Sequence, residues 1–374
     1  MAGIYIHIPF CKQACNYCDF HFSTNLSNRE AMIAAIVTEL QREKIYLQGQ
    51  PIESIYFGGG TPSLLSGQEL SDILNAVYQL FQVNPSAEIT LEANPDDIHA
   101  SKILAFKNLG INRLSIGIQS FNDENLKFMH RAHDAKEASN CVKIAQDNGI
   151  DNLSIDLIYG IPSSNHDHLI VDLQQAFALQ TKHISAYCLT IEDKTTFGHL
   201  VKKGKMKPIE EEFAAQQYEM MVEAMEGNGF EQYEISNFAK DNSYAIHNSN
   251  YWKQKHYLGV GPGAHSYNGS SRHYNISNNN KYIKLIAAGE KPSTTEMLTL
   301  NDQTNEYILT TLRTKWGCNL KYLEELNPNF IKLHQSTIDK LISRNLMMLQ
   351  NQILYLSKEG KIQADKITEA FFII

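Results

Sequence analysis

Three cysteines close to the start of the chain, Cys11, Cys15 and Cys18, follow a CxxxCxxC pattern. Three thiolates at this spacing can bind three irons of a [4Fe-4S] cube and leave the fourth iron open. A small molecule with an amine and a carboxylate can chelate that open iron. The pattern therefore predicts a site where an iron–sulfur cluster meets a chelating small molecule.

Other uses of these thiols also fit the spacing. A tetrahedral zinc site needs a fourth ligand, which His7 or His21 could supply. A disulfide fits less well, because three cysteines cannot pair evenly and nothing at the N-terminus resembles a secretory signal. The other cysteines, Cys141, Cys188 and Cys318, stand alone and are interpreted as ordinary core residues.

Composition indicates a globular protein of two domains. The chain has 374 residues, of which 43% are hydrophobic and 20% charged. No apolar run approaches the roughly 18 residues of a membrane span. The net charge of -8 argues against a nucleic-acid binder, which needs clustered Lys and Arg. Reduced thiols and the lack of a targeting segment predict a cytoplasmic protein.

The first 235 residues alternate short β-rich runs with amphipathic stretches, which is typical of βα units around a parallel sheet. Strands are expected at residues 3–9, 54–58, 88–94, 113–119, 152–159 and 183–191. Helices are expected at residues 28–46, 67–80, 135–148 and 168–178. Six such units predict an incomplete barrel. Ser27 and Glu30 offer a capping box, and the polar stretch 268–280 is interpreted as a loop.

Polar residues follow the predicted strands at their carboxyl ends, where β/α barrels carry their active sites. They are Gly58, Gly59, Gly60, Thr61, Glu92, Asn94, Gln119, Asp156 and Glu192. Any one of them could make a structural hydrogen bond, but the set predicts a polar cofactor at this rim. The glycine triplet lacks dinucleotide and P-loop spacing; it allows a ligand such as an amino acid to approach the backbone closely.

The cysteine pattern and the Gly-Gly-Gly-Thr-Pro run together resemble the radical S-adenosylmethionine superfamily. The runs YIHIPFC at 5–11, EANP at 92–95, SIGIQSF at 115–121 and DLIYGIP at 156–162 resemble its oxygen-independent coproporphyrinogen oxidase-like branch. The resemblance implies that Cys11, Cys15 and Cys18 bind a 4Fe-4S cluster. The residues that it implies for S-adenosylmethionine are Tyr5, Tyr17, Gly59, Gly60, Thr61, Glu92, Gln119, Arg131 and Asp156.

Within that branch the chain differs from the porphyrinogen-oxidising enzymes. Those enzymes carry a cysteine two residues after the third ligand, where this chain has Phe20, and a longer arm before the motif. The run HNSNYW at 247–252 instead fits the HNxxYW pattern of the HemW-type haem chaperones. This resemblance implies a protein that binds haem, passes it to haem-requiring proteins and receives electrons from a donor. The alternative is an oxygen-independent coproporphyrinogen dehydrogenase.

Haem contact by this motif is a separate expectation. His247 could ligate the iron, while Tyr251 and Trp252 offer flat faces to a porphyrin. Alternatively, His247 makes a hydrogen bond in a loop and Trp252 fills core. His265, in the glycine-rich run that follows, is a second candidate ligand for haem.

The alternation of single strands and helices ends before residue 295. The expected domains are therefore a barrel at 1–235, a connecting segment at 236–294 and a C-terminal domain at 295–374. Helices are expected at residues 301–315, 320–326, 336–344 and from 358, with strands at 347–349 and 353–356. The predicted fold is therefore α/β, an incomplete (β/α)6 TIM-like barrel followed by an α+β, winged-helix-like domain. Nine basic and nine acidic residues in 293–374 favour a docking or covering module over a DNA-binding one.

Overall fold

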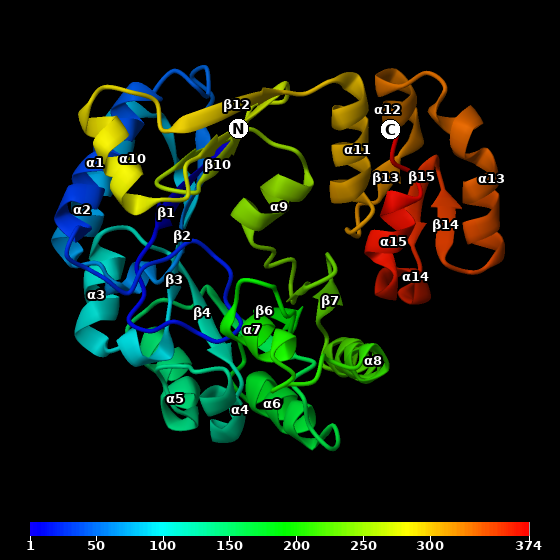
Figure 1. The fold of residues 1–374 in the computed structure, drawn as a ribbon, viewed down its shortest axis with the longest axis horizontal. Coiled ribbons are helices and arrows are strands. Elements are labelled where there is room, and N and C mark those ends of the chain that lie inside the picture. Colours follow the sequence, from blue (N-terminus) through cyan, green and yellow to red (C-terminus); the bar gives the residue numbers. More distant parts are fainter. Residues whose placement is uncertain (374) are drawn as a thin grey trace.

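The structure, a computed structural model, describes residues 1–373 and is built around one twelve-stranded sheet. Six parallel strands form its centre, as the sequence predicts (Figure 1). They are β1 (Ala2–Ile8), β2 (Ile52–Gly59), β3 (Val83–Ala93), β4 (Arg113–Gln119), β5 (Leu153–Tyr159) and β6 (His183–Cys188). The sheet curves into an incomplete barrel, so the carboxyl ends of neighbouring strands meet along one rim.

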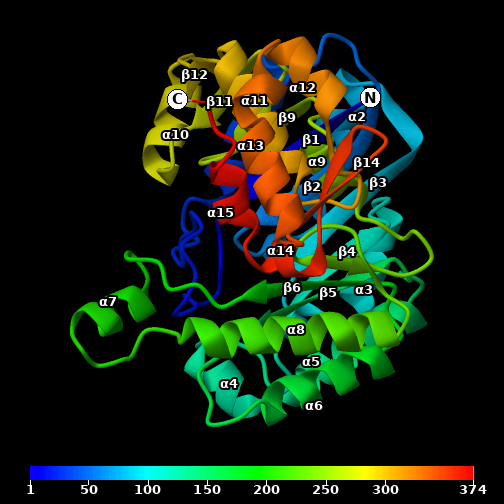
Figure 2. The same ribbon diagram turned by 90° about the vertical axis from the view of Figure 1, so that its right-hand side faces the viewer.

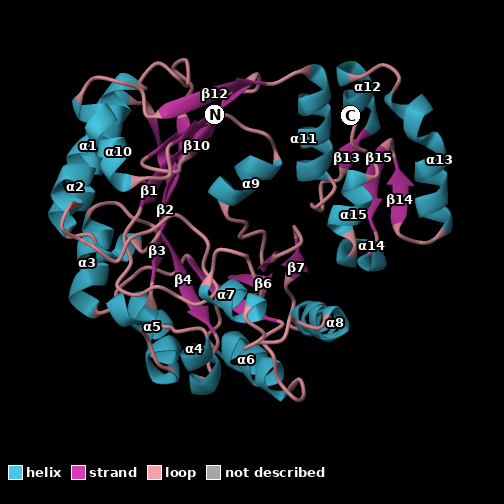
Figure 3. Cartoon of the chain, in the orientation of Figure 1, coloured by secondary structure: helices cyan, strands magenta, loops and turns pink. Residues whose placement is uncertain are grey.

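Helices cover the outer side of the curved sheet (Figure 3). In the barrel part they are α1 (Arg29–Arg42), α2 (Gly67–Leu80), α3 (Ala100–Asn108), α4 (Asp123–Phe128), α5 (Ala135–Asp147), α6 (Asp167–Ala178), α7 (Thr196–Lys202) and α8 (Glu211–Gly227). The predicted capping box at Ser27 and Glu30 is wrong: α1 starts at Arg29, and its cap, Asn28, makes no side-chain bond. A capping box forms instead at Ser66 and Glu69, before α2.

The alternation along β1 explains how one strand serves both the core and a functional surface. Ile4, Ile6 and Ile8 are fully buried and pack in the core beneath α1 and α2. Tyr5 and His7 alternate with them and therefore face the inner side of the barrel. Burial of the isoleucines fixes the register, so the polar side chains must point inward.

Residues 236–294 complete the sheet rather than merely connecting two domains. Here β9 (Tyr257–Val260) pairs in parallel with β1. The next strands are antiparallel, namely β10 (His265–Tyr267), β11 (Ser271–Asn275) and β12 (Ser293–Met297). At the other edge lie β8 (Asn237–Ala239) and β7 (Glu231–Gln232), and the segment also holds α9 (Ile246–Trp252) and α10 (Asn279–Ala287). The predicted loop at 268–280 is thus wrong, because it contains β11 and the start of α10.

The C-terminal part forms an α+β, winged-helix-like unit with its own core. Its elements are α11 (Leu300–Thr311), β13 (Cys318–Asn319), α12 (Leu320–Leu326), α13 (Phe330–Ser343), β14 (Met347–Gln350), β15 (Ile353–Leu356), α14 (Lys358–Ile362) and α15 (Ala364–Glu369). The three strands form a small antiparallel sheet. The unit lies beside α9 and the β9–β12 edge (Figures 1 and 2), and the Lys315–Glu231 and Arg272–Glu306 ion pairs link it to the barrel.

Among residues 1–373, no helix has the length and apolar character needed to cross a lipid bilayer.

Candidate functional site

The three cysteines lie on the loop that follows β1, and backbone hydrogen bonds hold this loop in place. The Cys11 amide donates to the Ser23 carbonyl at 3.1 Å, and the Ser23 amide donates to the Pro9 carbonyl at 2.9 Å. Further along, the Asn16 amide donates to the carbonyl of Met129, just after α4, at 3.0 Å. The loop is therefore tied at its base and again near its middle, which limits how far the thiols can move.

All three thiols line one cavity of about 460 Å³, here named the cysteine cavity. Thr61 Oγ1 donates to Cys11 Sγ at 3.4 Å, and Arg131 Nη1 donates to Cys15 Sγ at 3.3 Å. Burial raises the pKa of the Cys11 thiol to about 11 and that of Cys18 to about 12. Within residues 1–373, no three His, Cys, Asp or Glu side chains are arranged to hold a single metal ion. The thiols border a space, which suits a multi-iron cluster.

The glycine-rich turn after β2 packs directly against the cysteine loop. The Gly60 amide donates to the Ile8 carbonyl at 2.8 Å, and the Thr61 amide donates to the Phe10 carbonyl at 2.7 Å. A Cβ on Gly60 would come within 2.6 Å of the Phe10 carbonyl oxygen, so only glycine fits. Because these amides are already engaged, a bound amino acid group would have to meet the carbonyl groups of the turn.

Two half-buried carboxylates, Glu92 at the end of β3 and Asp156 in the middle of β5, line the cysteine cavity. Glu92 accepts from the Tyr56 hydroxyl at 2.8 Å and from the Gly59 amide at 3.2 Å. Burial raises the pKa of Glu92 to about 7 and that of Asp156 to about 6. Asp156 also accepts from the Ser115 hydroxyl at 3.3 Å. Each carboxylate can therefore accept a hydrogen bond from a hydroxyl or amine of a ligand in the cavity.

Arg131 joins the cysteine loop to the strand ends. Its Nη2 donates to Asn94 Oδ1 and to the Gly117 carbonyl, both at 2.8 Å, and its Nη1 donates to the Tyr17 hydroxyl at 3.3 Å. The Nε atom of Arg131 is buried without a partner. A buried donor without a partner beside three thiols and two carboxylates fits a site that receives a polar ligand.

The structure brings together most of the predicted site residues and separates two. The cysteine cavity is lined by Cys11, Cys15, Cys18, Tyr17, Gly59, Gly60, Thr61, Glu92, Gln119, Arg131 and Asp156. Tyr5 lies outside it: its hydroxyl makes a hydrogen bond of 3.1 Å to His7 Nδ1, and its ring lines a neighbouring cavity.

His247 does not line either cavity, contrary to the expectation that it faces haem. It is buried, with its Nδ1 hydrogen-bonded to the Ser54 hydroxyl at 2.8 Å and its Nε2 to the Tyr251 hydroxyl at 2.9 Å. Both ring nitrogens are thus engaged, so neither offers a free lone pair to iron. The HNxxYW histidine holds α9 against β2 in this structure. Haem ligation by His247 stays a prediction, and it would require the ring to give up one of these two hydrogen bonds.

Several residues of the cysteine cavity were missed by sequence reasoning, among them Tyr56 and Ser115. Cys188, which was expected in the core, is exposed and also lines this cavity. Tyr56 lies two residues before Gly58 on β2, and Ser115 lies four residues before Gln119 on β4. Alternate residues of a strand share a face. Counting back in steps of two from Gly58 and Gln119, which had been recognised, would therefore have found Tyr56 and Ser115.

The parallel barrel with three free thiols at its rim, beside a glycine turn and two half-buried carboxylates, defines the class of radical S-adenosylmethionine proteins. Residues 5–176 match the Radical SAM superfamily. The chain is 34% identical to heme chaperone HemW of Bacillus subtilis, with 99% of both chains covered. It is 31% identical to the protein of the same name from Lactococcus lactis, over 99% of this chain and 97% of that one. The chain belongs to the HemW family of this superfamily.

A solved structure shows the same fold at lower sequence identity. Coproporphyrinogen III oxidase (HemN) from Escherichia coli, a radical SAM enzyme, superposes with a TM-score of 0.85. The match covers 99% of this chain and 89% of that one, at 20% sequence identity. The incomplete barrel and the C-terminal unit are therefore shared with that enzyme. At this sequence identity the similarity supports a shared fold and nothing more.

Proposed function

We propose that this protein is a haem chaperone, which binds haem and transfers it to proteins that require it. The observation that carries this proposal is the similarity along nearly the whole chain to curated proteins named heme chaperone HemW. Phe20 adds support, because it occupies the position at which the related porphyrinogen oxidases are expected to have a further cysteine.

We further propose that the cysteine cavity holds a 4Fe-4S cluster and S-adenosylmethionine, rather than zinc. Cys11, Cys15 and Cys18 would bind the cluster, and Arg131 would lie beside it through its hydrogen bond to Cys15. When bound, such a cluster supplies an electron to the sulfonium of S-adenosylmethionine. The protein would then need an electron donor as a partner. It would function in a reducing compartment such as the cytoplasm.

The remaining side chains of the cavity have binding and enclosing roles. Glu92 and Asp156 can accept hydrogen bonds from ribose hydroxyls or an amine, since both are carboxyl groups that line the cavity. Carbonyls of the turn at Gly59 and Gly60 can accept from the amine of the methionine part. Tyr17, on the cysteine loop, accepts a hydrogen bond from Arg131 and lines the cavity, where its ring can limit the entry of water.

An anaerobic haem titration of the reconstituted protein tests the chaperone proposal. We expect about one haem per chain, with transfer to an apo-haem protein and no protoporphyrinogen formed from coproporphyrinogen on the same sample. A lack of haem uptake would overturn the proposal. Rapid, cluster-dependent formation of protoporphyrinogen would replace it with the dehydrogenase alternative.

A further inference from the structure

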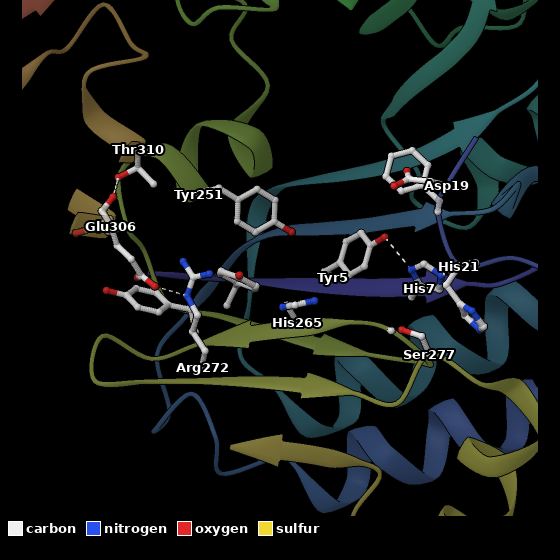
Figure 4. Close-up of a pocket in the computed structure, with 15 residues that line it drawn as sticks. Tyr5, His7, Asp19, His21, Tyr251, His265, Arg272, Ser277, Glu306 and Thr310 are labelled. Atoms are coloured by element: carbon white, nitrogen blue, oxygen red, sulfur yellow. Dashed lines mark hydrogen bonds and ion pairs between the residues drawn. The ribbon is translucent and has the colours of Figure 1, made fainter. Parts of the chain in front are cut away.

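A second cavity, of about 620 Å³, lies on the inner side of the sheet between β1, the β9–β11 strands and α11. We name it the histidine cavity; Figure 4 shows its lining. Its volume is within the range of about 300–1,000 Å³ that is usual for small-molecule and cofactor sites. Asp19 and Phe20 line both this cavity and the cysteine cavity, so the two adjoin at the loop that carries Cys18.

Three histidines reach this cavity, and they differ in how their ring nitrogens are used. His7 is fully engaged, by the Tyr5 hydroxyl at 3.1 Å and by the His21 carbonyl at 2.9 Å. His21 Nε2 makes a hydrogen bond of 2.7 Å to Asn279 Oδ1. No hydrogen bond is found within residues 1–373 for either ring nitrogen of His265. Of the three, His265 is therefore the one with both ring nitrogens free of hydrogen bonds, whereas His21 has one nitrogen bound and His7 has two.

The surroundings of His265 keep its ring neutral and accessible. Burial lowers its pKa, and the neighbouring charge of Arg272 lowers it further. A neutral imidazole carries the lone pair that iron requires. The ring belongs to the exposed first residue of β10 and lies between Arg272 and Tyr5 in the cavity (Figure 4).

The walls of the cavity combine flat aromatic faces with one cation, Arg272, and two carboxylates, Asp19 and Glu306. Tyr5, Tyr251, Tyr257, Tyr267 and Phe20 supply aromatic surface. Arg272 Nε makes an ion pair with Glu306 Oε1, on α11, at 2.6 Å. Aromatic faces suit a planar macrocycle, and a guanidinium suits a carboxylate. One cavity thus contains a candidate iron ligand, aromatic walls and a guanidinium that can bind a carboxylate.

We infer that the histidine cavity is the place where the protein holds haem, with His265 as an axial ligand of the iron and Arg272 as the partner of a propionate. This inference rests on the proposed chaperone function. It gives the C-terminal unit a role, because α11 closes the cavity through Glu306 and Thr310. It also puts the cargo next to the cluster loop, where the state of one site can affect the other.

The first test replaces the ligand. The variants His265→Ala and His265→Met, with His273→Ala as matched control on β11 outside the cavity, are reconstituted anaerobically and titrated with haem. We expect His265→Ala to weaken haem affinity roughly tenfold or more. His265→Met should shift the Soret and visible bands, because it changes the ligand atom from nitrogen to sulfur. Iron and sulfide content should stay unchanged in all three, which shows that they fold.

The second test addresses the propionate. Wild-type protein should bind haem more tightly than haem dimethyl ester, and Arg272→Ala should bind the two alike. Wild-type affinity and spectrum in both His265 variants would overturn the inference while leaving the chaperone proposal standing. If the wild-type protein binds no haem at all, the chaperone proposal fails, and the inference fails with it.

Discussion

Arg131 donates from Nη1 to the Sγ of Cys15 at 3.3 Å, across a sequence separation of 116 residues. The same guanidinium holds Asn94 and the carbonyl of Gly117, so it fixes the cysteine loop to the ends of β3 and β4. A cationic donor next to a cluster ligand stabilises extra negative charge on the cluster. The relation between these two residues therefore bears on the redox properties of the proposed cluster as well as on its position.

Replacing Arg131 by Gln should lower the reduction potential of the reconstituted cluster. In the wild-type protein the guanidinium charge and the N–H···S bond stabilise the more negative, reduced cluster, so their loss makes reduction less favourable. A shift of about 60 mV corresponds to a tenfold change in a one-electron equilibrium. Redox titration followed by EPR measures the shift. Arg42→Gln is the control, because Arg42 binds the carbonyls of Ile286 and Glu290 away from the cavity. An unchanged potential with full iron content would contradict the assignment of Arg131.

Each of Cys11, Cys15 and Cys18, changed to Ala, should prevent assembly of a full cluster. We expect iron and sulfide content and the absorption near 400 nm to fall to background in the triple variant. Cys141→Ala serves as control, because Cys141 is buried on α5 in the core. A triple variant that retains four irons, or a wild-type protein that takes up zinc instead, would rule out the proposed centre.

Gly60→Ala should be far more damaging than Gly67→Ala. A Cβ on Gly60 would meet the Phe10 and Ile8 carbonyl oxygens at 2.6 and 2.8 Å, so the turn and the cysteine loop must separate. Gly67 begins α2 in open space, where alanine stabilises by up to about 1 kcal/mol. Thermal melts should show a loss of stability, and equilibrium dialysis a loss of S-adenosylmethionine binding, in Gly60→Ala but not in Gly67→Ala. Equal binding in the two variants would contradict this packing argument.

The sequence was enough to predict the parallel strands and the rim, because burial leaves strong local patterns. Strand β4 has the predicted bounds, and alternate residues of β1 face opposite sides as the hydrophobic period requires. Glu92, Gln119 and Asp156 line one cavity because they lie on three neighbouring parallel strands and face the same side of the sheet.

Contacts between distant segments could not be predicted in the same way. The partners of His247 are Ser54, 193 residues away, and Tyr251, and nothing local signals that the first will meet it. The strand β11 lacks a hydrophobic run, since its conformation depends on pairing with β10 and β12. The histidine cavity arises from such pairings and from α11, so its members are scattered along the chain.

Glu39 on α1 should make stability depend on pH. It is buried and accepts hydrogen bonds from the Gly261 amide at 2.8 Å, Tyr282 Oη at 2.6 Å and Asn275 Nδ2 at 2.7 Å. Burial nevertheless raises its pKa from 4.5 to about 7. The unfolded chain therefore releases this proton first as the pH rises. The contribution of Glu39 is complete below about pH 4.5 and declines until about pH 7.

The expected loss is about 3 kcal/mol at most, taking about 1.4 kcal/mol per pKa unit. Glu92 and Asp156 also make stability fall as the pH rises, because their pKa values are raised as well. The wild-type protein must therefore be compared with Glu39→Gln, which retains Glu92 and Asp156. We expect this variant to be less stable, since its amide N–H faces donors, and to lose less stability between pH 5 and pH 7. Thermal melts across this range measure the difference, with exposed Glu30→Gln as control on the same helix. Parallel curves for wild type and Glu39→Gln would show that Glu39 is ionised throughout.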